Sequence, residues 1–172
     1  YVHIISRASG RRIEIYANKL DNEDAGNKTI TDILSKKKME PAIIVYRGHS
    51  YQVEPDLNTT ITRNVALVFI GSCGGYNNIA TVLRNAPQTH IISTKGTGSM
   101  YVNDPMLRVL NDFILTHNAI NWKAYWEEAA SNKDIADNKN FDAYIRPDMN
   151  LGVTFLKAYR NILLDLDNKS GD

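Results

Sequence analysis

The sequence predicts an α/β fold, a three-layer αβα sandwich with a mostly parallel central sheet and an N-terminal hairpin. Three short apolar runs, at residues 42–46, 65–70 and 90–93, lack the alternation of half-exposed strands. Such runs are typical of strands that are buried on both faces of a parallel sheet. Segments with helical periodicity lie between and after these runs. This alternation of strand and helix predicts a parallel sheet that helices cover.

The first 41 residues predict a hairpin followed by one helix. Residues 1–7 and 11–16 alternate apolar and polar side chains around an Ala-Ser-Gly turn, which indicates a β-hairpin. The stretch 18–28 is rich in Asn, Asp and Gly, so we expect a surface loop there. From Thr29 the apolar residues recur at helical spacing, and the pattern stops before Pro41.

Two further helices are expected after the second and third strands. One covers residues 77–85, and the other covers residues 105–116. The apolar residues of the second helix form a stripe along one face, and they are Met106, Val109, Leu110, Phe113 and Ile114. Asp104 is the expected N-cap of the latter helix, with Pro105 in its first turn. The connection 51–64 shows no clear periodicity and is expected to be an extended loop or a short excursion.

The last 50 residues predict two helices separated by a loop. A helix is expected over residues 122–130, and the polar stretch 131–150 reads as an ordered loop. A final helix over residues 152–166 places four apolar side chains on one side. These are Phe155, Tyr159, Ile162 and Leu163.

Composition bounds the class of protein. The chain has 172 residues, of which 43% are hydrophobic and 23% are charged, as is typical of one globular domain. A net charge of +1 argues against nucleic acid or a membrane surface as the main partner. The chain opens at Tyr1, directly in strand-like sequence, so we expect residues 1–172 to be a single domain within a longer protein. The compartment stays open, because a signal peptide would lie in the part that precedes Tyr1.

Metal and cofactor sites are not expected. The single cysteine cannot form an internal disulfide, and the four histidines are far apart in the sequence. No zinc or haem spacing is present. The glycine-rich segments also lack the Gly-Lys-Ser/Thr ending of a phosphate-binding P-loop.

Chemistry-bearing residues follow two of the predicted strands. The first strand runs into Gly-His-Ser at 48–50, and the second runs into GSCGG at 71–75. Ligands of open parallel sheets bind beyond the carboxyl ends of the strands, so neighbouring strands would place His49 and Cys73 at one edge. A nearby imidazolium or a helix N-terminus lowers the pKa of a thiol from about 8.5 toward neutrality. The pairing favours a nucleophilic Cys73 over the alternative, a small buried residue at a strand end.

These two motifs resemble those of the caspase-like cysteine peptidases of clan CD, and most closely the gingipain, clostripain and CHAT-like branches. In that group a strand that ends in histidine and glycine precedes a strand that ends in a small residue and cysteine. The motifs span residues 42–95, and the order of elements agrees over the whole chain. The resemblance implies a caspase-like fold, a bacterial-type protein and an endopeptidase that needs no cofactor.

The resemblance also implies roles for individual residues. Cys73 would attack the scissile carbonyl of a peptide or protein substrate, and His49 would assist proton transfer to the leaving amine. Backbone around the nucleophile would bind the oxyanion, with Ser50, Gly48 and Gly74 as the candidate positions beside Cys73. Residues after the third strand would wall the substrate pocket, namely Lys95, Tyr101, Asn103 and Asp104. Branches of the group cleave after acidic, basic or asparagine residues, and all three choices stay open.

Two other functions use the same residues. Ser50 stands where the group usually has glycine, and the interval of 24 positions between His49 and Cys73 is shorter than the roughly 50 of the caspase signature. Both departures fit a catalytically inactive caspase-like domain that serves as a binding module or scaffold. Alternatively, residues 71–75 also fit the Gly-x-Cys-x-Gly elbow of hydrolases and amidotransferases. That alternative needs a downstream histidine, which would be His90 or His117.

Overall fold

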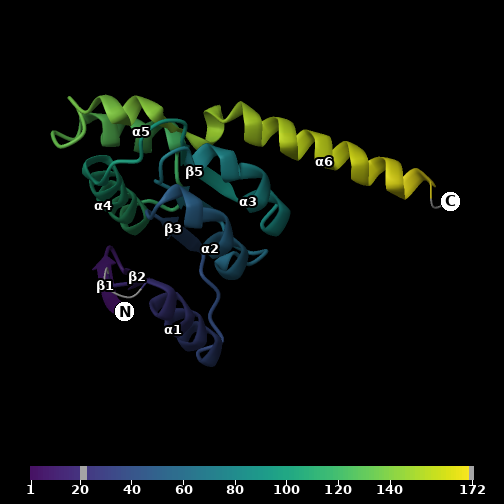
Figure 1. The fold of residues 1–172 in the computed structure, drawn as a ribbon. Helices are drawn as coiled ribbons and strands as arrows, with labels where there is room; N and C mark the ends of the chain where they lie inside the picture. The colour runs from purple at the N-terminus through teal and green to yellow at the C-terminus, as the bar shows by residue number, and fades with distance from the viewer. Residues whose placement is uncertain (20–22, 171–172) are drawn as a thin grey trace. The chain divides into compact units, whose positions relative to one another are not determined.

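The structure is a computed structural model that describes residues 1–19 and 23–170. Within these residues the chain forms helices and two β-sheets, one of them four-stranded and mostly parallel (Figure 1). The predicted α/β class is therefore confirmed. The internal contacts divide the chain into two compact units. Unit 1 comprises Tyr1–Pro41 and Tyr101–Asn138, and unit 2 comprises Ala42–Met100 and the chain from Lys139 on.

Unit 1 begins with the predicted hairpin. Strand β1 (Val2–Ala8) pairs antiparallel with β2 (Arg11–Ala17). The two residues of the turn, Ser9 and Gly10, have φ angles of 52° and 77°. Positive φ at both central positions is the pattern of the type I′ turn, whose twist matches that of the two strands. The prediction of a hairpin is thus confirmed, and local turn chemistry accounts for it.

The first helix starts earlier than the sequence predicts. Helix α1 (Glu23–Lys36) begins six residues before Thr29, so the predicted surface loop is wrong from Glu23 onward. Residues 20–22 of that predicted loop lie outside the described residues. Polar residues of this stretch occupy an exposed helical surface, where Lys28 pairs with Asp32 at 2.9 Å. Polar residues occur in loops and also on exposed helix faces, where i,i+4 ion pairs stabilise the helix. Polarity alone therefore does not distinguish the two.

The fourth helix also starts earlier than predicted. Helix α4 (Met100–Thr116) contains Pro105 in its interior, so the predicted N-cap role of Asp104 is wrong. A proline in the second turn removes one backbone N–H from the helix. The fully buried side chains of Val102 and Met106 offset that loss by removing apolar surface from water.

The fifth helix agrees with its prediction. Helix α5 (Trp122–Ser131) is preceded by its N-cap, Asn121, whose side chain accepts a hydrogen bond of 3.1 Å from the backbone N–H of Ala124. This is the usual N-cap interaction. On the buried side of the helix, the hydroxyl of Tyr125 donates to the carbonyl oxygen of Met106 at 3.1 Å, which joins α5 to α4.

Unit 2 is built on the four-stranded sheet. Strands β3 (Ile43–Tyr46), β4 (Leu67–Ile70) and β5 (His90–Thr94) are parallel neighbours in that order, which confirms the three predicted strands. All of β4 is buried, as expected of a central strand. Strand β3 lies at an edge and leaves Val45 42% exposed, so burial on both faces holds only for the inner strands.

A fourth strand interrupts the predicted loop over residues 131–150, which is therefore wrong in part. Strand β6 (Tyr144–Ile145) pairs antiparallel with β5. It lies between two 3₁₀ helices, η3 (Lys139–Ala143) and η4 (Pro147–Met149). A strand of two residues is too short to show any periodicity in the sequence.

Helices α2 (Val53–Thr60), α3 (Ile79–Asn85) and α6 (Leu151–Ser170) complete unit 2, together with the 3₁₀ helices η1 (Ser50–Gln52) and η2 (Gly75–Asn78). The helices α3 and α6 were expected, whereas the extended connection predicted over 51–64 is wrong because α2 occupies it. Val53 and Leu57 of α2 are fully buried. They join a core cluster with residues of β4, α3, β5, α6 and the chain next to β4 and α3, which are Val65, Val68, Ile70, Ile79, Val82, Leu83, Ala86, Ile91 and Val153.

None of the helices within residues 1–19 and 23–170 combines the length and the apolarity that crossing a membrane requires.

Candidate functional site

The register of the sheet relates the two predicted catalytic residues. Strands β3 and β4 are adjacent, and Tyr46, the last residue of β3, lies opposite Ile70, the last residue of β4. His49 and Cys73 each follow their strand end by three residues. Both residues therefore leave the sheet at its carboxyl edge, where open α/β sheets bind their ligands.

The loop that bears Cys73 is tightly built, although the thiol itself is exposed. Gly74 adopts a left-handed conformation with φ of 62°, and its N–H donates to the carbonyl oxygen of Gly96 at 2.9 Å. The N–H of Gly75 closes a turn on the carbonyl of Ser72 at 3.1 Å. A Cβ on Gly75 would lie 2.7 Å from the carbonyl oxygen of Ile70, so only glycine fits there.

The loop beyond β5 packs directly on the Cys73 loop. The hydroxyl of Thr94 lies 3.2 Å from the carbonyl oxygen of Ser72 and 2.9 Å from that of Gly96, and it donates toward both. A Cβ on Gly98 would lie 2.0 Å from the carbonyl oxygen of Gly71. The backbones of the two loops thus approach more closely than any side chain at position 98 would allow. The sequence motif around Cys73 does not reveal this dependence on a second loop.

His49 lies on the loop beyond β3. Its ring stacks on Tyr51, with centroids 5.5 Å apart and planes inclined by 11°. The hydroxyl of Tyr46 donates to the carbonyl oxygen of His49 at 2.8 Å, and a Cβ on Gly48 would lie 2.6 Å from the same hydroxyl. In the described part of the chain, the His49 ring makes no hydrogen bond to Cys73.

The backbone N–H groups of Ser50 and Cys73 donate no hydrogen bond to any residue in 1–19 or 23–170. The N–H of Gly74 already donates to the carbonyl oxygen of Gly96, so it does not also point at a ligand. Gly48 provides room for the Tyr46 hydroxyl. The role of these backbone positions in binding an oxyanion stays a prediction.

Tyr144 is a neighbour of this site that the sequence analysis missed. Its side chain is buried, and its hydroxyl accepts a hydrogen bond of 3.1 Å from the backbone N–H of Ser99. The pKa of Tyr144 is raised, mainly because the side chain is buried. Cys73 raises it as well, whereas the hydrogen bond from the Ser99 backbone and the charge of Arg47 lower it. Tyr144 pairs with Thr94, whose hydroxyl donates to the carbonyl oxygen of Ser72 beside Cys73. No motif marks Tyr144, because its strand is only two residues long.

The predicted pocket residues fall in two places. Lys95 is exposed on the loop beyond β5, with its Nζ 4.9 Å from the centroid of the Tyr76 ring. Tyr101, Asn103 and Asp104 lie in the first turns of α4, so the predicted loop at these positions is wrong. Except for the exposed Tyr101, these side chains of α4 are buried or partly buried. Their role in a pocket stays a prediction.

The histidines at positions 90 and 117 lie in other parts of the fold. His90 opens β5 opposite Leu67, at the end of the sheet away from Cys73. Burial lowers the pKa of His90, and the charge of Lys157 lowers it further. His117 follows α4 and stacks on Phe113, with ring centroids 4.0 Å apart.

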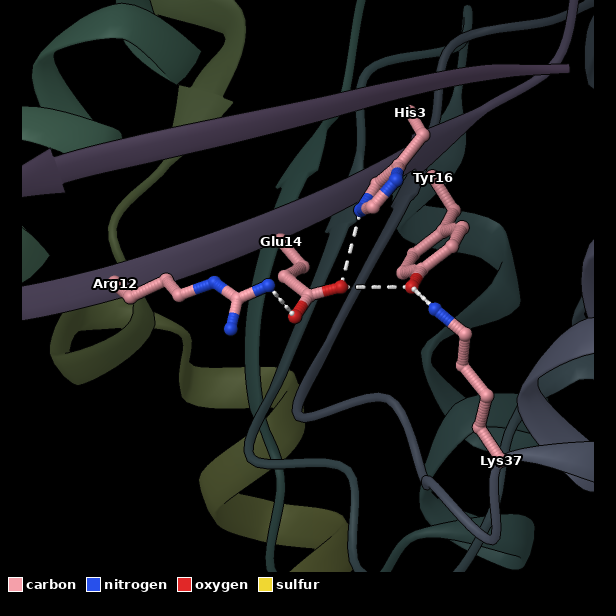
Figure 2. Close-up of polar contacts among 5 residues, drawn as sticks. All are labelled: His3, Arg12, Glu14, Tyr16 and Lys37. Atoms are coloured by element: carbon pink, nitrogen blue, oxygen red, sulfur yellow. Dashed lines mark hydrogen bonds and ion pairs between the residues drawn. The ribbon is translucent and has the colours of Figure 1, made fainter.

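His3 belongs to a polar cluster on the hairpin (Figure 2). One carboxylate oxygen of Glu14 accepts from the Tyr16 hydroxyl at 2.8 Å and lies 3.0 Å from Nε2 of His3, while the other lies 2.5 Å from Arg12. The Nζ of Lys37 donates to the Tyr16 hydroxyl at 2.7 Å. The hydrogen bond from Tyr16 is the main cause that lowers the pKa of Glu14, and Tyr16 likewise raises the pKa of Lys37. The cluster ties β2 to the chain that follows α1.

The candidate site of unit 2 thus consists of an exposed thiol, an imidazole at the equivalent position of the adjacent strand, and two backbone N–H groups that bond to no acceptor among the described residues. No known protein family matches the sequence, no curated protein is similar to it, and no solved structure matches its fold.

Proposed function

We propose that this chain is a cysteine peptidase with a caspase-like three-layer sandwich fold, in which Cys73 is the nucleophile and His49 assists proton transfer. The observation that supports the proposal is the register of β3 and β4, which gives His49 and Cys73 the same offset at the carboxyl edge of the sheet. Their order along the chain, histidine first, agrees with the resemblance of the two motifs to clan CD.

The proposed reaction proceeds in two steps. The thiolate of Cys73 attacks the scissile carbonyl carbon, and the resulting oxyanion accepts hydrogen bonds from the N–H groups of Cys73 and Ser50. When the C–N bond breaks, the leaving amine takes a proton from His49 and a thioester remains on Cys73. Water then attacks the thioester, which releases the carboxylic acid and regenerates the thiol.

The construction of the Cys73 loop supports this chemistry. Gly74, Gly75 and the loop beyond β5 hold the backbone on both sides of the thiol. A nucleophile that is held in place loses little entropy in reaching the attacking geometry. An exposed thiol at this point is also accessible to an extended peptide.

Thiol alkylation tests the proposal directly, because Cys73 is the only cysteine in the chain. We expect iodoacetamide to alkylate Cys73 at neutral pH faster than it alkylates free cysteine, because the thiolate is the reactive form and a nearby imidazolium favours it. His49→Ala should slow this alkylation, whereas the control His90→Ala should leave the rate unchanged because His90 lies at the other end of the sheet. An alkylation rate that equals that of free cysteine and does not depend on His49 would refute the dyad.

A peptide library then tests turnover and identifies the cleaved residue. Cleavage that Cys73→Ala abolishes would establish a peptidase. A reactive thiol without any cleavage would indicate a zymogen that requires activation.

A second candidate, an inactive binding domain, is favoured by one observation. His49 stacks on Tyr51, and its ring makes no hydrogen bond to Cys73 among the described residues. An unreactive thiol in the alkylation experiment would select this candidate. The nucleophile-elbow alternative gains no support, because His90 lies at the opposite end of β5 from the Cys73 loop.

A further inference from the structure

Helix α6 exposes a row of large apolar side chains that no described residue covers. Six of them are between 43% and 82% exposed, and they are Leu151, Phe155, Tyr159, Ile162, Leu163 and Leu166. At 100° per residue these positions fall within an arc of about 120°, and we call this surface the α6 stripe. The core-facing side of the helix is different, because Val153 and Leu156 pack there. Helix α6 also continues well past α3 (Figure 1).

The size of the α6 stripe suits an interface. The exposed parts of its six residues amount to about three and a half whole residues, or on the order of 600 Å² at about 170 Å² for a large side chain. That is the upper end of what a monomer leaves exposed in one patch. Two such stripes together would bury about 1,200 Å², which is above the roughly 1,000 Å² that a specific interface needs.

The order of the apolar residues fits a second copy of the same helix in the opposite direction. About a centre between Ala158 and Tyr159, Leu151 faces Leu166 and Phe155 faces Ile162 of an antiparallel copy. We propose that the α6 stripe is a homodimer interface in which the two α6 helices pair antiparallel. This inference is independent of the peptidase proposal, since no residue of the Cys73 site takes part in it.

Charge favours the antiparallel orientation. Lys157 and Arg160 lie on the core-facing side of α6, where they donate to the carbonyl oxygens of Thr89 at 2.9 Å and Leu83 at 3.0 Å. The second half of the helix carries Asp165 and Asp167. In the antiparallel register these two positions lie beside the start of α6 in the other copy, where the helix dipole favours negative charge. A parallel pair would instead place each aspartate beside the same aspartate of the other copy.

Light scattering on the full chain across a range of concentrations tests the dimer. We expect a dimer whose dissociation constant rises at least tenfold in Ile162→Glu, because that change buries a carboxylate in the apolar interface. Leu164→Glu is the matched control, since Leu164 is 50% exposed on the same helix but lies about 160° from the centre of the stripe. It should leave the dissociation constant unchanged, and circular dichroism should show both variants folded.

Three results would overturn the proposal. One is a protein that stays monomeric at every concentration. That result includes the case in which hydrogen exchange shows that another part of the same chain protects the α6 stripe. Another is a dimer that survives Ile162→Glu. The third is an equal loss of dimer in both glutamate variants.

Single-cysteine crosslinking in a Cys73→Ser background tests the orientation. An antiparallel pair predicts a disulfide between two copies of Tyr159→Cys, and a mixed disulfide between Leu151→Cys and Leu166→Cys. Leu166→Cys alone should not crosslink, because its two copies lie at opposite ends of the interface. Efficient self-crosslinking of Leu166→Cys would indicate a parallel pair and refute the proposed arrangement.

Discussion

At the scale of single residues, glycines decide where Cys73 lies. A Cβ on Gly98 would meet the carbonyl oxygen of Gly71 at 2.0 Å and the carbonyl carbon of Ser72 at 2.7 Å. Both are backbone atoms, so they cannot move aside as the end of a flexible side chain can. The position of the thiol therefore depends on a glycine that follows a different strand.

Gly98→Ala should destabilise the protein by about 1–3 kcal/mol, because the two loops must separate to admit the new methyl group. The same variant should change the alkylation rate of Cys73. Gly96→Ala is the matched control, since its Cβ would meet only the Cβ of Ala143, at 3.1 Å. Urea unfolding of both variants checks this prediction, and equal midpoints would contradict it.

At the scale of elements, α6 is attached to unit 2 near the start of β5. The Nζ of Lys157 donates to the carbonyl oxygen of Thr89, the residue before His90. Burial lowers the pKa of Lys157, and burial together with Lys157 lowers the pKa of His90. Burial thus disfavours the charged forms of two groups that lie where the helix and the strand join.

This arrangement predicts a dependence of stability on pH. In the unfolded chain His90 titrates near its ordinary pKa of 6.5, and in the folded chain its pKa is lower. Below pH 6.5 the unfolded state binds more protons at this residue, so the free energy of unfolding falls as the pH falls and is insensitive to His90 above that range. Protonation of Glu14 lowers the free energy of unfolding further, but only below its ordinary pKa of 4.5, because its pKa in the folded chain is lower than that value.

Urea unfolding between pH 5 and pH 8 in His90→Gln measures the contribution of His90. The decline of stability below pH 6.5 should be shallower in the variant than in the wild-type protein. An identical decline in both proteins would assign the pH dependence to other groups.

At the scale of the whole molecule, the core of unit 2 joins elements that are far apart in the sequence. Leu57 of α2 packs in one cluster with Val68 of β4, Val82 of α3 and Val153 of α6. The sheet that positions His49 and Cys73 is therefore stabilised by residues from most of unit 2.

Leu57→Ala should lower the free energy of unfolding by about 2–5 kcal/mol, because Leu57 is fully buried and its truncation leaves a cavity. Thr59→Ala on the same helix is the control, since Thr59 is exposed and should change stability by about 0.5 kcal/mol or less. Denaturant titration distinguishes the two, and a small effect of Leu57→Ala would show that the core tolerates the cavity by collapsing.

The sequence by itself determined the features that local chemistry specifies. The Ser9-Gly10 turn, the three parallel strands and the placement of His49 and Cys73 just beyond two of them all follow from patterns within short windows. These predictions are confirmed because turn residues and long apolar runs have few other structures open to them.

Only the tertiary structure decided the rest. The burial of Val53 and Leu57 turns the expected loop over 51–64 into α2, and pairing with β5 makes a strand of Tyr144 and Ile145. The close approach of Gly98 to Gly71 and the hydrogen bond from Ser99 to Tyr144 also join residues that are far apart in the chain. Such features depend on long-range contacts, and no local periodicity encodes a contact between distant segments.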